Sequence, residues 1–423
     1  MTSSGTSRVH VIGAGLAGLS AAVTLADRGI PVTLSEAARQ AGGRCRSYHD
    51  SVLDMVIDNG NHLVLAGNEA VTRYLHAIGA GDRLSGPERA EFPFFDLGAR
   101  TRWTLRPNDG PIPWWVLDSR RRVPGTRIGD YLAFVRLMRR HPGRRIDEVI
   151  DCHGPLWNRF LKQLLVSALN TAPEDGAADL AGAVVRETLA KGGRATRPLV
   201  ATPSLAAAFV DPALSHLQGR GAEIRLGRPL RSVTLAEGSV SALHFDDGAQ
   251  RVEAGDRVIL AVPPWAAQSF LPDVKAPSVF NAIVNAHFRV TPPARAPLVV
   301  GVIGGTAEWV FAFHDRLSVT VSAADRLLDT ENDRLAALLW AEVAAVHDLS
   351  GPVPAARIVK EKRATFAATP AQDACRPAAQ TRWRNLFLAG DWTDTGLPAT
   401  IEGALRSGEV AARLAARASS ESA

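Results

Sequence analysis

Cysteine and long apolar runs are scarce in this sequence of 423 residues. The three cysteines, Cys45, Cys152 and Cys375, are far apart and form no C-x-x-C pair. We therefore expect no disulfide framework, no metal centre and a reducing compartment. The one membrane-like run, 9–26, contains three glycines and lacks a cleavage-site pattern, so we expect neither a signal peptide nor a membrane-spanning helix.

Positive charge is abundant in one segment only. The whole chain carries a net charge of +5, whereas residues 100–145 contain twelve arginines, no lysine and three acidic residues, a net charge of +9. This local cluster favours contact with an anionic surface or ligand, and a salt-bridged, solvated face is the alternative. A protein that binds nucleic acid would be basic more generally, so we expect no nucleic-acid partner. The hydrophobic content of 46% excludes global disorder.

Strands and helices alternate at both ends of the chain as in a dinucleotide-binding α/β domain. A β-branched run at 9–12, an apolar helical pattern over 16–28 and a second strand at 31–36 form a βαβ beginning. A buried-type strand at 385–389 and a helix from about 400 to 417 repeat this order near the C-terminus.

The middle of the chain contains three segments of different character. Residues 222–262 predict strands, two of them linked by the turn 246–248. Residues 131–190 predict helices, whereas residues 280–322 alternate as antiparallel strands do and lead into a helix over 331–347. We therefore expect a second domain inserted between separated pieces of the first.

A glycine-rich turn follows the first strand. Residues 13–18 read Gly-Ala-Gly-Leu-Ala-Gly, the G-x-G-x-x-G pattern in which glycines permit a tight turn and let the backbone approach a pyrophosphate. The N-terminal end of the following helix supplies free N–H groups to the phosphates. Glu36 ends the second strand, where a carboxylate accepts hydrogen bonds from ribose hydroxyls and repels a 2′-phosphate. An unrelated glycine-rich turn is the alternative.

A second glycine pair distinguishes a flavin protein from an NAD-only protein. Residues 39–44 read Arg-Gln-Ala-Gly-Gly-Arg, and an extended FAD needs close backbone and an arginine at this point. Residues 58–62 read Asp-Asn-Gly-Asn-His, and Gly390-Asp391 follows the C-terminal strand. These motifs together resemble the flavin amine oxidase and phytoene desaturase superfamily.

The resemblance implies FAD as cofactor and a role for each motif. The turn 58–62 would bring backbone under the flavin ring, Val233 would contact the adenine, and Asp391 would bind the ribityl or pyrophosphate portion. The helix that starts near Thr400 would direct its positive end at the flavin N1/C2 carbonyl. The implied cofactor-binding residues are Gly13, Ala14, Gly15, Leu16, Ala17, Gly18, Glu36, Ala37, Gly43, Arg44, Asn59, Gly60, Asn61, His62, Val233, Gly390, Asp391, Pro398, Ala399, Thr400 and Ile401.

A narrower resemblance rests on three stretches outside these motifs. Residues 111–115 read Pro-Ile-Pro-Trp-Trp, residues 122–126 read Arg-Val-Pro-Gly-Thr and residues 169–174 read Leu-Asn-Thr-Ala-Pro-Glu. With the FAD motifs, they resemble the hydroxysqualene dehydroxylase family over nearly the whole chain. The resemblance implies reductive removal of the hydroxyl of hydroxysqualene to give squalene in hopanoid biosynthesis, with hydride from N5 of reduced FAD.

Other activities remain open at this point. An isoprenoid desaturase for carotenoids or squalene shares the motifs, and so does an amine oxidase, although the five lysines occur in no recognisable context. A prenyl-lipid carrier on the same fold is the alternative from a different class. A triterpene substrate would need an apolar tunnel, and the arginine cluster would hold the enzyme on an anionic membrane. We therefore expect a cytoplasmic protein, peripheral on the inner face of the cell membrane, and the electron donor is not identified.

The acid that assists departure of the hydroxyl is not selected by the sequence. Hydroxide is a poor leaving group, so an acid must protonate it or a positive site must stabilise it. His62 and Glu402 are the catalytic candidates. Asp96 and Asn170 are further possibilities, although Asn170 could only donate a hydrogen bond.

We predict an α/β protein, α+β overall, in which a Rossmann-like FAD-binding domain of the flavin amine oxidase type contains an inserted substrate domain of mixed sheet and helix. The predicted FAD-binding segments are 1–95, 196–274 and 353–423. The predicted substrate domain comprises a helical, membrane-facing part at 96–195 and an antiparallel sheet at 275–352.

Overall fold

Five parallel strands from three distant parts of the chain form one sheet. The computed structural model describes residues 7–420, so the extreme ends of the first and last predicted segments lie outside the described residues. The strand order is β10-β2-β1-β14-β20, and each neighbouring pair is parallel. The bounds are Val9–Ile12 (β1), Val32–Ser35 (β2), Glu223–Arg225 (β10), Arg257–Leu260 (β14) and Leu386–Leu388 (β20). The predicted first and last strands therefore belong to the same sheet.

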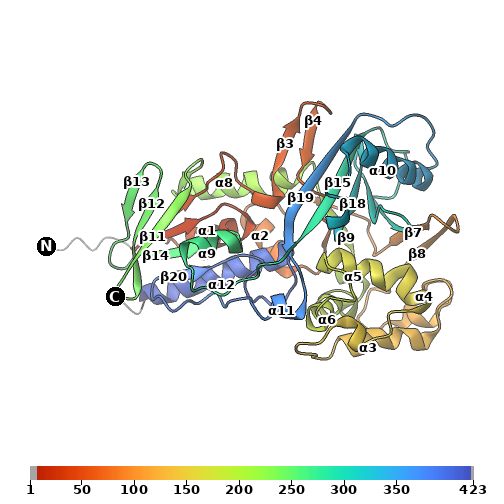
Figure 1. The fold of residues 1–423 in the computed structure, drawn as a ribbon, viewed down its shortest axis with the longest axis horizontal. Coiled ribbons are helices and arrows are strands. Elements are labelled where there is room, and N and C mark those ends of the chain that lie inside the picture. Colours follow the sequence, from red (N-terminus) through yellow and green to blue (C-terminus); the bar gives the residue numbers. More distant parts are fainter. Residues whose placement is uncertain (1–6, 421–423) are drawn as a thin grey trace.

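Helices α1 (Leu16–Ala26) and α12 (Ile401–Ser420) pack against each other and against this sheet (Figure 1). A Cβ on Gly408 of α12 would lie 2.2 Å from the carbonyl oxygen of Ala17 in α1. Glycine thus permits a backbone approach that any larger residue would prevent. The close packing brings the N-terminal and C-terminal motifs together.

A seven-stranded sheet occupies the other end of the molecule (Figure 1). Its order is β19-β15-β18-β17-β16-β7-β8. The strands span Phe92–Asp96 (β7), Thr101–Leu105 (β8), Phe280–Arg289 (β15), Val299–Ile303 (β16), Trp309–Ala312 (β17), Arg316–Val321 (β18) and Ala356–Phe366 (β19). The antiparallel strands predicted in 280–322 are confirmed as β15 to β18, and the predicted helix after them is α10, Asn332–His347.

The two faces of this sheet differ, as alternation along the strands requires. Val284, Ala286 and Phe288 of β15 pack under α10 with other apolar residues. The intervening residues Asn285 and His287 are polar and buried, and they point to the opposite face. That face meets the loop that follows β4 (Met55–Asp58) and the helical segment of the chain.

Strands β7 and β19 pair outside the segments to which we assigned them. β7 lies almost wholly in the predicted first FAD-binding segment and β19 in the last, yet β7 pairs with β16 and β19 with β15. The Phe94 ring of β7 fills the space that Gly301 leaves open, since a Cβ there would lie 2.4 Å from the ring. The division of the chain into domains remains a prediction, with these two strands in the second sheet.

The helical segment lies beside the seven-stranded sheet and is more broken than predicted. Its α-helices are α3 (Leu132–Leu137), α4 (Gly154–Leu156), α5 (Lys162–Leu169), α6 (Ala178–Glu187) and α7 (Gly193–Thr196). One continuous helix was expected from 156 to 169, but a π-helical turn, Trp157–Leu161, separates α4 from α5. None of the helices within residues 7–420 is long and apolar enough to cross a membrane.

Shorter elements complete the fold. The turn 246–248 leads into β13, a strand that was not predicted. With β13 added, the sheet at this turn has three strands, in the order β11-β12-β13. The remaining strands are β3 (Ser47–Asp50), β4 (Met55–Asp58), β5 (Val64–Leu65), β6 (Leu84–Ser85), β9 (Pro198–Ala201), β11 (Leu230–Ala236), β12 (Ser239–Phe245) and β13 (Gly248–Arg251). The remaining α-helices are α2 (Glu69–Ala77), α8 (Asp211–Gly219), α9 (Pro264–Phe270) and α11 (Pro370–Asp373).

Candidate flavin-binding and active site

The glycine turn after β1 has the geometry that a pyrophosphate site needs. Gly13 has a φ of +106°, and a Cβ on it would lie 2.4 Å from the carbonyl oxygen of Ala261. At Gly15, in contrast, no atom lies within 4 Å of the Cβ position, and no side chain caps the N-terminal end of α1. Open space therefore adjoins the free N–H groups of the helix, as phosphate binding requires.

Glu36 is held in place beside this turn. One carboxylate oxygen accepts a hydrogen bond from the Ala14 N–H at 2.6 Å and the other from the Ala38 N–H at 2.9 Å. Because each carboxylate oxygen has two lone pairs, acceptor capacity remains for ribose hydroxyls. Ala37 lies between Glu36 and Ala38 in the chain, and its contact with the cofactor remains a prediction.

The second glycine pair lies against the first turn. The Gly42 N–H donates to the Ala14 carbonyl at 2.8 Å, and a Cβ on Gly43 would lie 3.4 Å from Cα of Gly15. The following Arg44 forms an ion pair of 2.7 Å with Asp391. Burial lowers the pKa of Arg44, but the charge and hydrogen bond of Asp391 outweigh this and raise it above its ordinary value. The predicted N-terminal and C-terminal motifs therefore meet through a charged pair.

The loop 58–62 lies under the polar face of the seven-stranded sheet. The Asn61 N–H donates to Oδ1 of Asn285 at 3.3 Å, and Nδ2 of Asn61 donates to the Thr320 hydroxyl at 3.2 Å. Asn59 donates to a carboxylate oxygen of Glu361 at 3.1 Å. Oδ1 of Asn61 is buried and lacks a hydrogen-bond partner. Such an orphaned acceptor fits a donor on a bound ligand.

The imidazole of His62 is a neutral group at this site. Burial, and to a lesser degree the positive charge of Arg44, lower its pKa to about 4. Within residues 7–420, no side chain or backbone group forms a hydrogen bond with its ring. His62 is therefore free to hydrogen-bond to a ligand, but at neutral pH it does not hold the proton of an imidazolium acid.

The N-terminal end of α12 is available to a ligand as well. The Thr400 hydroxyl accepts a hydrogen bond from the Gly403 N–H at 3.0 Å and so caps the helix. Pro398 and Ala399 come directly before this cap, and Ile401 begins the helix. The positive end of α12 follows the segment that contains Asp391 in the chain, and its direction toward the flavin remains a prediction.

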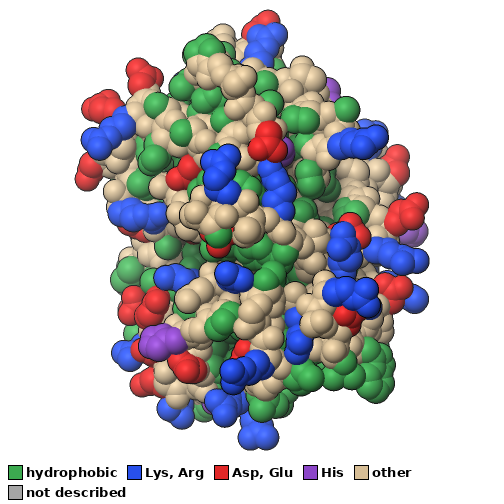
Figure 2. All heavy atoms as spheres, turned by 90° about the vertical axis from the view of Figure 1, so that its right-hand side faces the viewer, with side chains coloured by type: hydrophobic (Ala, Val, Ile, Leu, Met, Phe, Trp, Pro, Cys, Tyr) green, Lys and Arg blue, Asp and Glu red, His purple; other side chains and the backbone are tan. Residues whose placement is uncertain are grey.

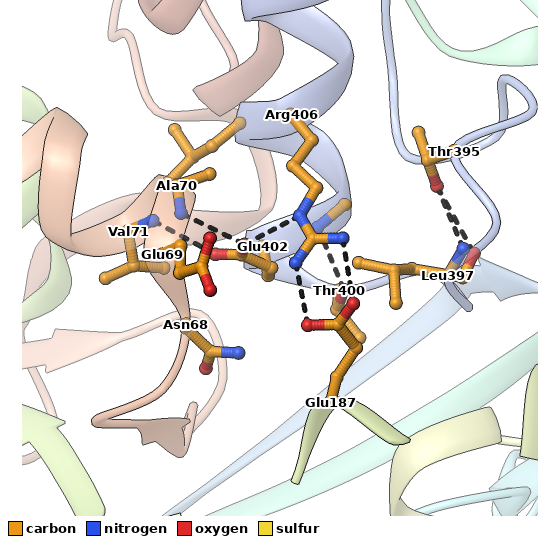
Figure 3. Close-up of polar contacts among 12 residues, drawn as sticks. Asn68, Glu69, Ala70, Val71, Glu187, Thr395, Leu397, Thr400, Glu402 and Arg406 are labelled. Atoms are coloured by element: carbon orange, nitrogen blue, oxygen red, sulfur yellow. Dashed lines mark hydrogen bonds and ion pairs between the residues drawn. The ribbon is translucent and has the colours of Figure 1, made fainter. Parts of the chain in front are cut away.

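The environment of Glu402 differs from the one expected for a catalytic residue. Its carboxylate oxygens accept hydrogen bonds from the Ala70 and Val71 N–H groups, both at 3.0 Å, and from Nε of Arg406 at 2.7 Å (Figure 3). Glu402 thus joins the first turn of α2 to α12 and is 4% exposed. The structure favours an anchoring role, because the carboxylate is surrounded by protein donors.

The two further acid candidates are also occupied by protein contacts. Oδ1 of Asp96 accepts a hydrogen bond from the Ala99 N–H in the turn after β7. The buried Asn170 side chain donates to the Thr365 hydroxyl at 2.9 Å and accepts from the Ala323 N–H at 2.6 Å. Asp96 therefore stabilises its own turn, whereas Asn170 joins α5 to distant parts of the chain.

Val233 lies on β11, an edge strand of its three-stranded sheet. It pairs with Leu243 on one side only, so backbone groups on the open side of β11 are accessible to an adenine.

The sequence reasoning missed Asn285 and Thr320, which hold the loop 58–62. A signal was present, since both are polar residues in strands that are otherwise strongly apolar.

Comparisons with known proteins agree with this site. A family model described as flavin containing amine oxidoreductase matches residues 16–416. A hydroxysqualene dehydroxylase from Rhodopseudomonas palustris is 53% identical over 408 residues, which are 96% of this chain and 97% of that protein. A chloroplastic/chromoplastic 15-cis-phytoene desaturase from Glycine max is 23% identical over 96% of this chain and 78% of that protein. Cyclohexylamine oxidase from Brevibacterium oxydans has a TM-score of 0.69 at 15% identity, covers 98% and 99% of the two chains, and shows the shared fold.

The chain is an FAD-dependent oxidoreductase of the flavin-containing amine oxidoreductase class. Within that class it belongs to the hydroxysqualene dehydroxylase family. The predicted fold class and the predicted FAD cofactor are thereby confirmed. The assignment of individual residues to FAD remains a prediction, and the geometry of the two glycine turns, Glu36 and Arg44 fits it.

Proposed function

We propose that this protein converts hydroxysqualene to squalene. The observation that carries the proposal is the 53% identity to a hydroxysqualene dehydroxylase over nearly the full length of both chains. The overall change replaces a C–O bond by a C–H bond, so it consumes a hydride and a proton and releases water. When bound, reduced FAD supplies the hydride.

The residues of this chain have three tasks in such a reaction. The turns 13–18 and 42–43, with Glu36 and Arg44, hold the cofactor. The aromatic rings of Phe160 and Trp309 each lie 5.8 Å from the ring of Phe94 and form with it a buried apolar core beside the sheet, which supports the substrate side of the fold. His62, as a neutral imidazole, donates or accepts a hydrogen bond at a bound ligand and does not act as a strong acid.

An anaerobic reduction experiment tests the proposal. The FAD-loaded protein is reduced with dithionite, freed of excess reductant and mixed with hydroxysqualene. We expect the flavin to reoxidise and squalene to appear in equal amount by mass spectrometry. A flavin that stays reduced, with no squalene, would show that the activity is a different one. Reduction of the oxidised flavin by squalene or phytoene would support the desaturase alternative, and a purified protein that takes up no FAD would support the lipid carrier.

We further propose that the protein works at the cytoplasmic face of the cell membrane, where its substrate is dissolved. Large apolar side chains on one segment are 46% to 62% exposed: Ile112, Trp114, Leu117, Ile128, Leu132 and Val135. They belong to the arginine-rich segment. Figure 2 shows hydrophobic and basic side chains together on the lower part of this end of the molecule. Apolar side chains flanked by arginines suit insertion into an anionic lipid surface.

Vesicle binding tests this surface. Trp114→Glu with Leu132→Glu should reduce sedimentation with phosphatidylglycerol vesicles at least tenfold, because both side chains would have to leave the apolar phase. The control is Leu338→Glu with Val353→Glu, two apolar side chains that are each 42% exposed on other parts of the surface. Equal binding by both double variants would refute the proposed docking face.

A further inference from the structure

A groove of about 680 Å³ lies apart from the cofactor residues. Four separate stretches line it: 66–67, 88–90, 109–111 and 191–197. None of the residues assigned to FAD is among the lining residues. Its size falls within the range of small-molecule sites, ~300–1,000 Å³.

Backbone hydrogen bonds fix the walls of this groove. The Gly67 N–H donates to the Ala195 carbonyl at 2.8 Å, and the Gly193 N–H donates to the Asn108 carbonyl at 2.7 Å. Gly192 has a φ of +85°, and a Cβ there would lie 2.3 Å from the Gly110 carbonyl oxygen. The loops therefore meet at glycines, and any other residue at these positions would force the backbone to shift.

Four basic side chains line the groove, and three of them lack a protein partner. Arg89, Arg194 and Arg197 form no ion pair or side-chain hydrogen bond with any residue in 7–420. Elsewhere in the chain most arginines are paired with acids, carbonyls or rings. Lys191, the fourth, donates to Glu187 at 2.8 Å and to Glu69 at 3.2 Å.

Two acidic residues, Glu88 and Asp109, also line the groove but pair with none of these arginines. The lining therefore carries a net charge of +2, counted from four basic and two acidic residues. Because the three arginines line one groove and form no ion pair there, a bound anion would pair with positive charge that the protein itself leaves unpaired. Arginine donors in a planar fork match the oxygens of phosphate in particular.

We propose that this groove binds the phosphate or diphosphate group of a small-molecule ligand. Two sources share that chemistry. One is a reduced nicotinamide dinucleotide, which carries a diphosphate and could supply the electrons that the proposed reaction consumes. The other is free inorganic diphosphate. The first source rests on the proposed function, whereas anion binding itself does not.

The position of the groove agrees with a ligand that serves the flavin. Ala66, which lines the groove, follows His62 by four residues. Four residues of extended chain span ~14 Å, so Ala66 lies no farther than this from His62 in the loop 58–62. Lys191 also connects to the cofactor side through charged contacts, since Glu187 pairs with Arg406 at 3.0 Å and Arg406 pairs with Glu402 of α12 (Figure 3).

Titration calorimetry of the FAD-loaded protein at low ionic strength tests the proposal. Inorganic diphosphate, NADPH and NADH are titrated separately, and anaerobic absorbance at the flavin band reports any reduction. We expect diphosphate to bind, and Arg194→Gln with Arg197→Gln to weaken its binding at least tenfold while the FAD content is unchanged. The matched control is Arg28→Gln with Arg334→Gln, two exposed arginines outside the groove, which should bind as the unaltered protein does.

The outcomes separate the two sources and the two proposals. NADPH or NADH that competes with diphosphate and reduces the flavin identifies a nucleotide electron donor. Diphosphate binding without nucleotide binding identifies the free anion as ligand. Absence of binding by all three, or equal binding by the double variant, overturns the site. Dehydroxylation by dithionite-reduced enzyme needs no ligand here, so failure of the proposed function would be recognised independently.

Discussion

Replacement of Glu402 by alanine removes the acceptor that holds two helices together. In the folded protein its carboxylate accepts hydrogen bonds from the first turn of α2, at Ala70 and Val71, and from Arg406 on its own helix. The side chain is 4% exposed, so water does not readily replace the lost acceptor. We expect the Glu402→Ala variant to fold but to unfold at a lower denaturant concentration.

The magnitude follows from the contacts. Each hydrogen bond to a charged group contributes ~1.5–3 kcal/mol, and the two N–H groups of α2 would be left buried and unpaired. Arg406 would keep its pair with Glu187 at 3.0 Å and adds little to the loss. We therefore expect the free energy of unfolding to fall by ~3–5 kcal/mol, in the range found when one partner of a buried charged pair is removed. Glu402→Gln keeps one acceptor oxygen and should lose ~2 kcal/mol.

Urea unfolding of the FAD-loaded protein, followed by tryptophan and flavin fluorescence, measures this loss. Glu409→Ala is the matched control, because Glu409 also joins α12 to α2, through Arg73 at 2.9 Å. Arg73 is 55% exposed, so this control pair should contribute less than ~1 kcal/mol. The difference in stability loss between the two variants separates the contribution of the buried Glu402 carboxylate from that of a surface ion pair on the same helices.

Turnover per bound flavin distinguishes an anchor from a catalytic acid. Measured well below the unfolding transition, it should change by less than ~10-fold in Glu402→Ala, since a factor of ten corresponds to ~1.4 kcal/mol of barrier. Unchanged stability together with a loss of turnover beyond ~100-fold would refute our interpretation and restore Glu402 as a catalytic residue.

Three further perturbations address the cofactor turn, the charged pair and a buried histidine. Gly13→Ala places a Cβ 2.4 Å from the Ala261 carbonyl oxygen at a φ of +106°, so we expect purified protein without the flavin absorbance band, and normal flavin content would contradict the assigned turn. Arg44→Met leaves Asp391 unpaired, and the Kd for FAD, measured by fluorescence titration, should rise at least tenfold; an unchanged Kd would show that the pair does not hold the cofactor. Burial, more than the charge of nearby arginine, lowers the pKa of His287 to about 3. The unfolded chain therefore binds this proton first, near the ordinary histidine pKa of 6.5, and stability is lost as pH falls from 6.5 toward 3. In His287→Gln the slope of unfolding free energy against pH should be lower by up to ~1.4 kcal/mol per pH unit in urea titrations, and an identical slope would mean that His287 is protonated when folded.

Local sequence patterns predicted the helices and strands that can be recognised from their own residues. The strand at 9–12, the helix after it and the strand at 31–36 follow from apolar runs and glycine stops, and the structure has β1, α1 and β2 there. Strict alternation over 280–322 likewise predicted the antiparallel strands β15 to β18. These signals need no knowledge of distant partners, because each strand or helix shows its buried side in its own sequence.

Partner choice over long distances was not predictable from such patterns. Nothing in the residues of β7 or β19 distinguishes the seven-stranded sheet from the five-stranded one, and the pairing depends on shape, as where Phe94 fills the space at Gly301. The same limit applies to Glu402. A carboxylate two residues into a helix has the same sequence signature whether it meets a ligand or the N-terminal end of another helix.

The arginine-rich segment shows why net charge alone did not decide between a membrane face and a salt-bridged face. The salt-bridged interpretation holds for part of the segment, and the membrane face stays a prediction for the rest. Arg102 pairs with Asp348 at 3.0 Å and Arg106 pairs with Glu91 at 2.9 Å, so these charges are satisfied within the protein. Arg136, in contrast, follows the exposed Leu132 by four residues on α3, Arg139 lies just beyond the end of that helix, and neither forms an ion pair within residues 7–420. These two arginines lie near exposed apolar side chains, as does Arg127 beside Ile128, and each arginine near an anionic surface would contribute ~1 kcal/mol. The proposed docking would therefore depend on the arginines that lie near exposed apolar side chains, and the total of +9 overstates the charge that is free to meet a membrane.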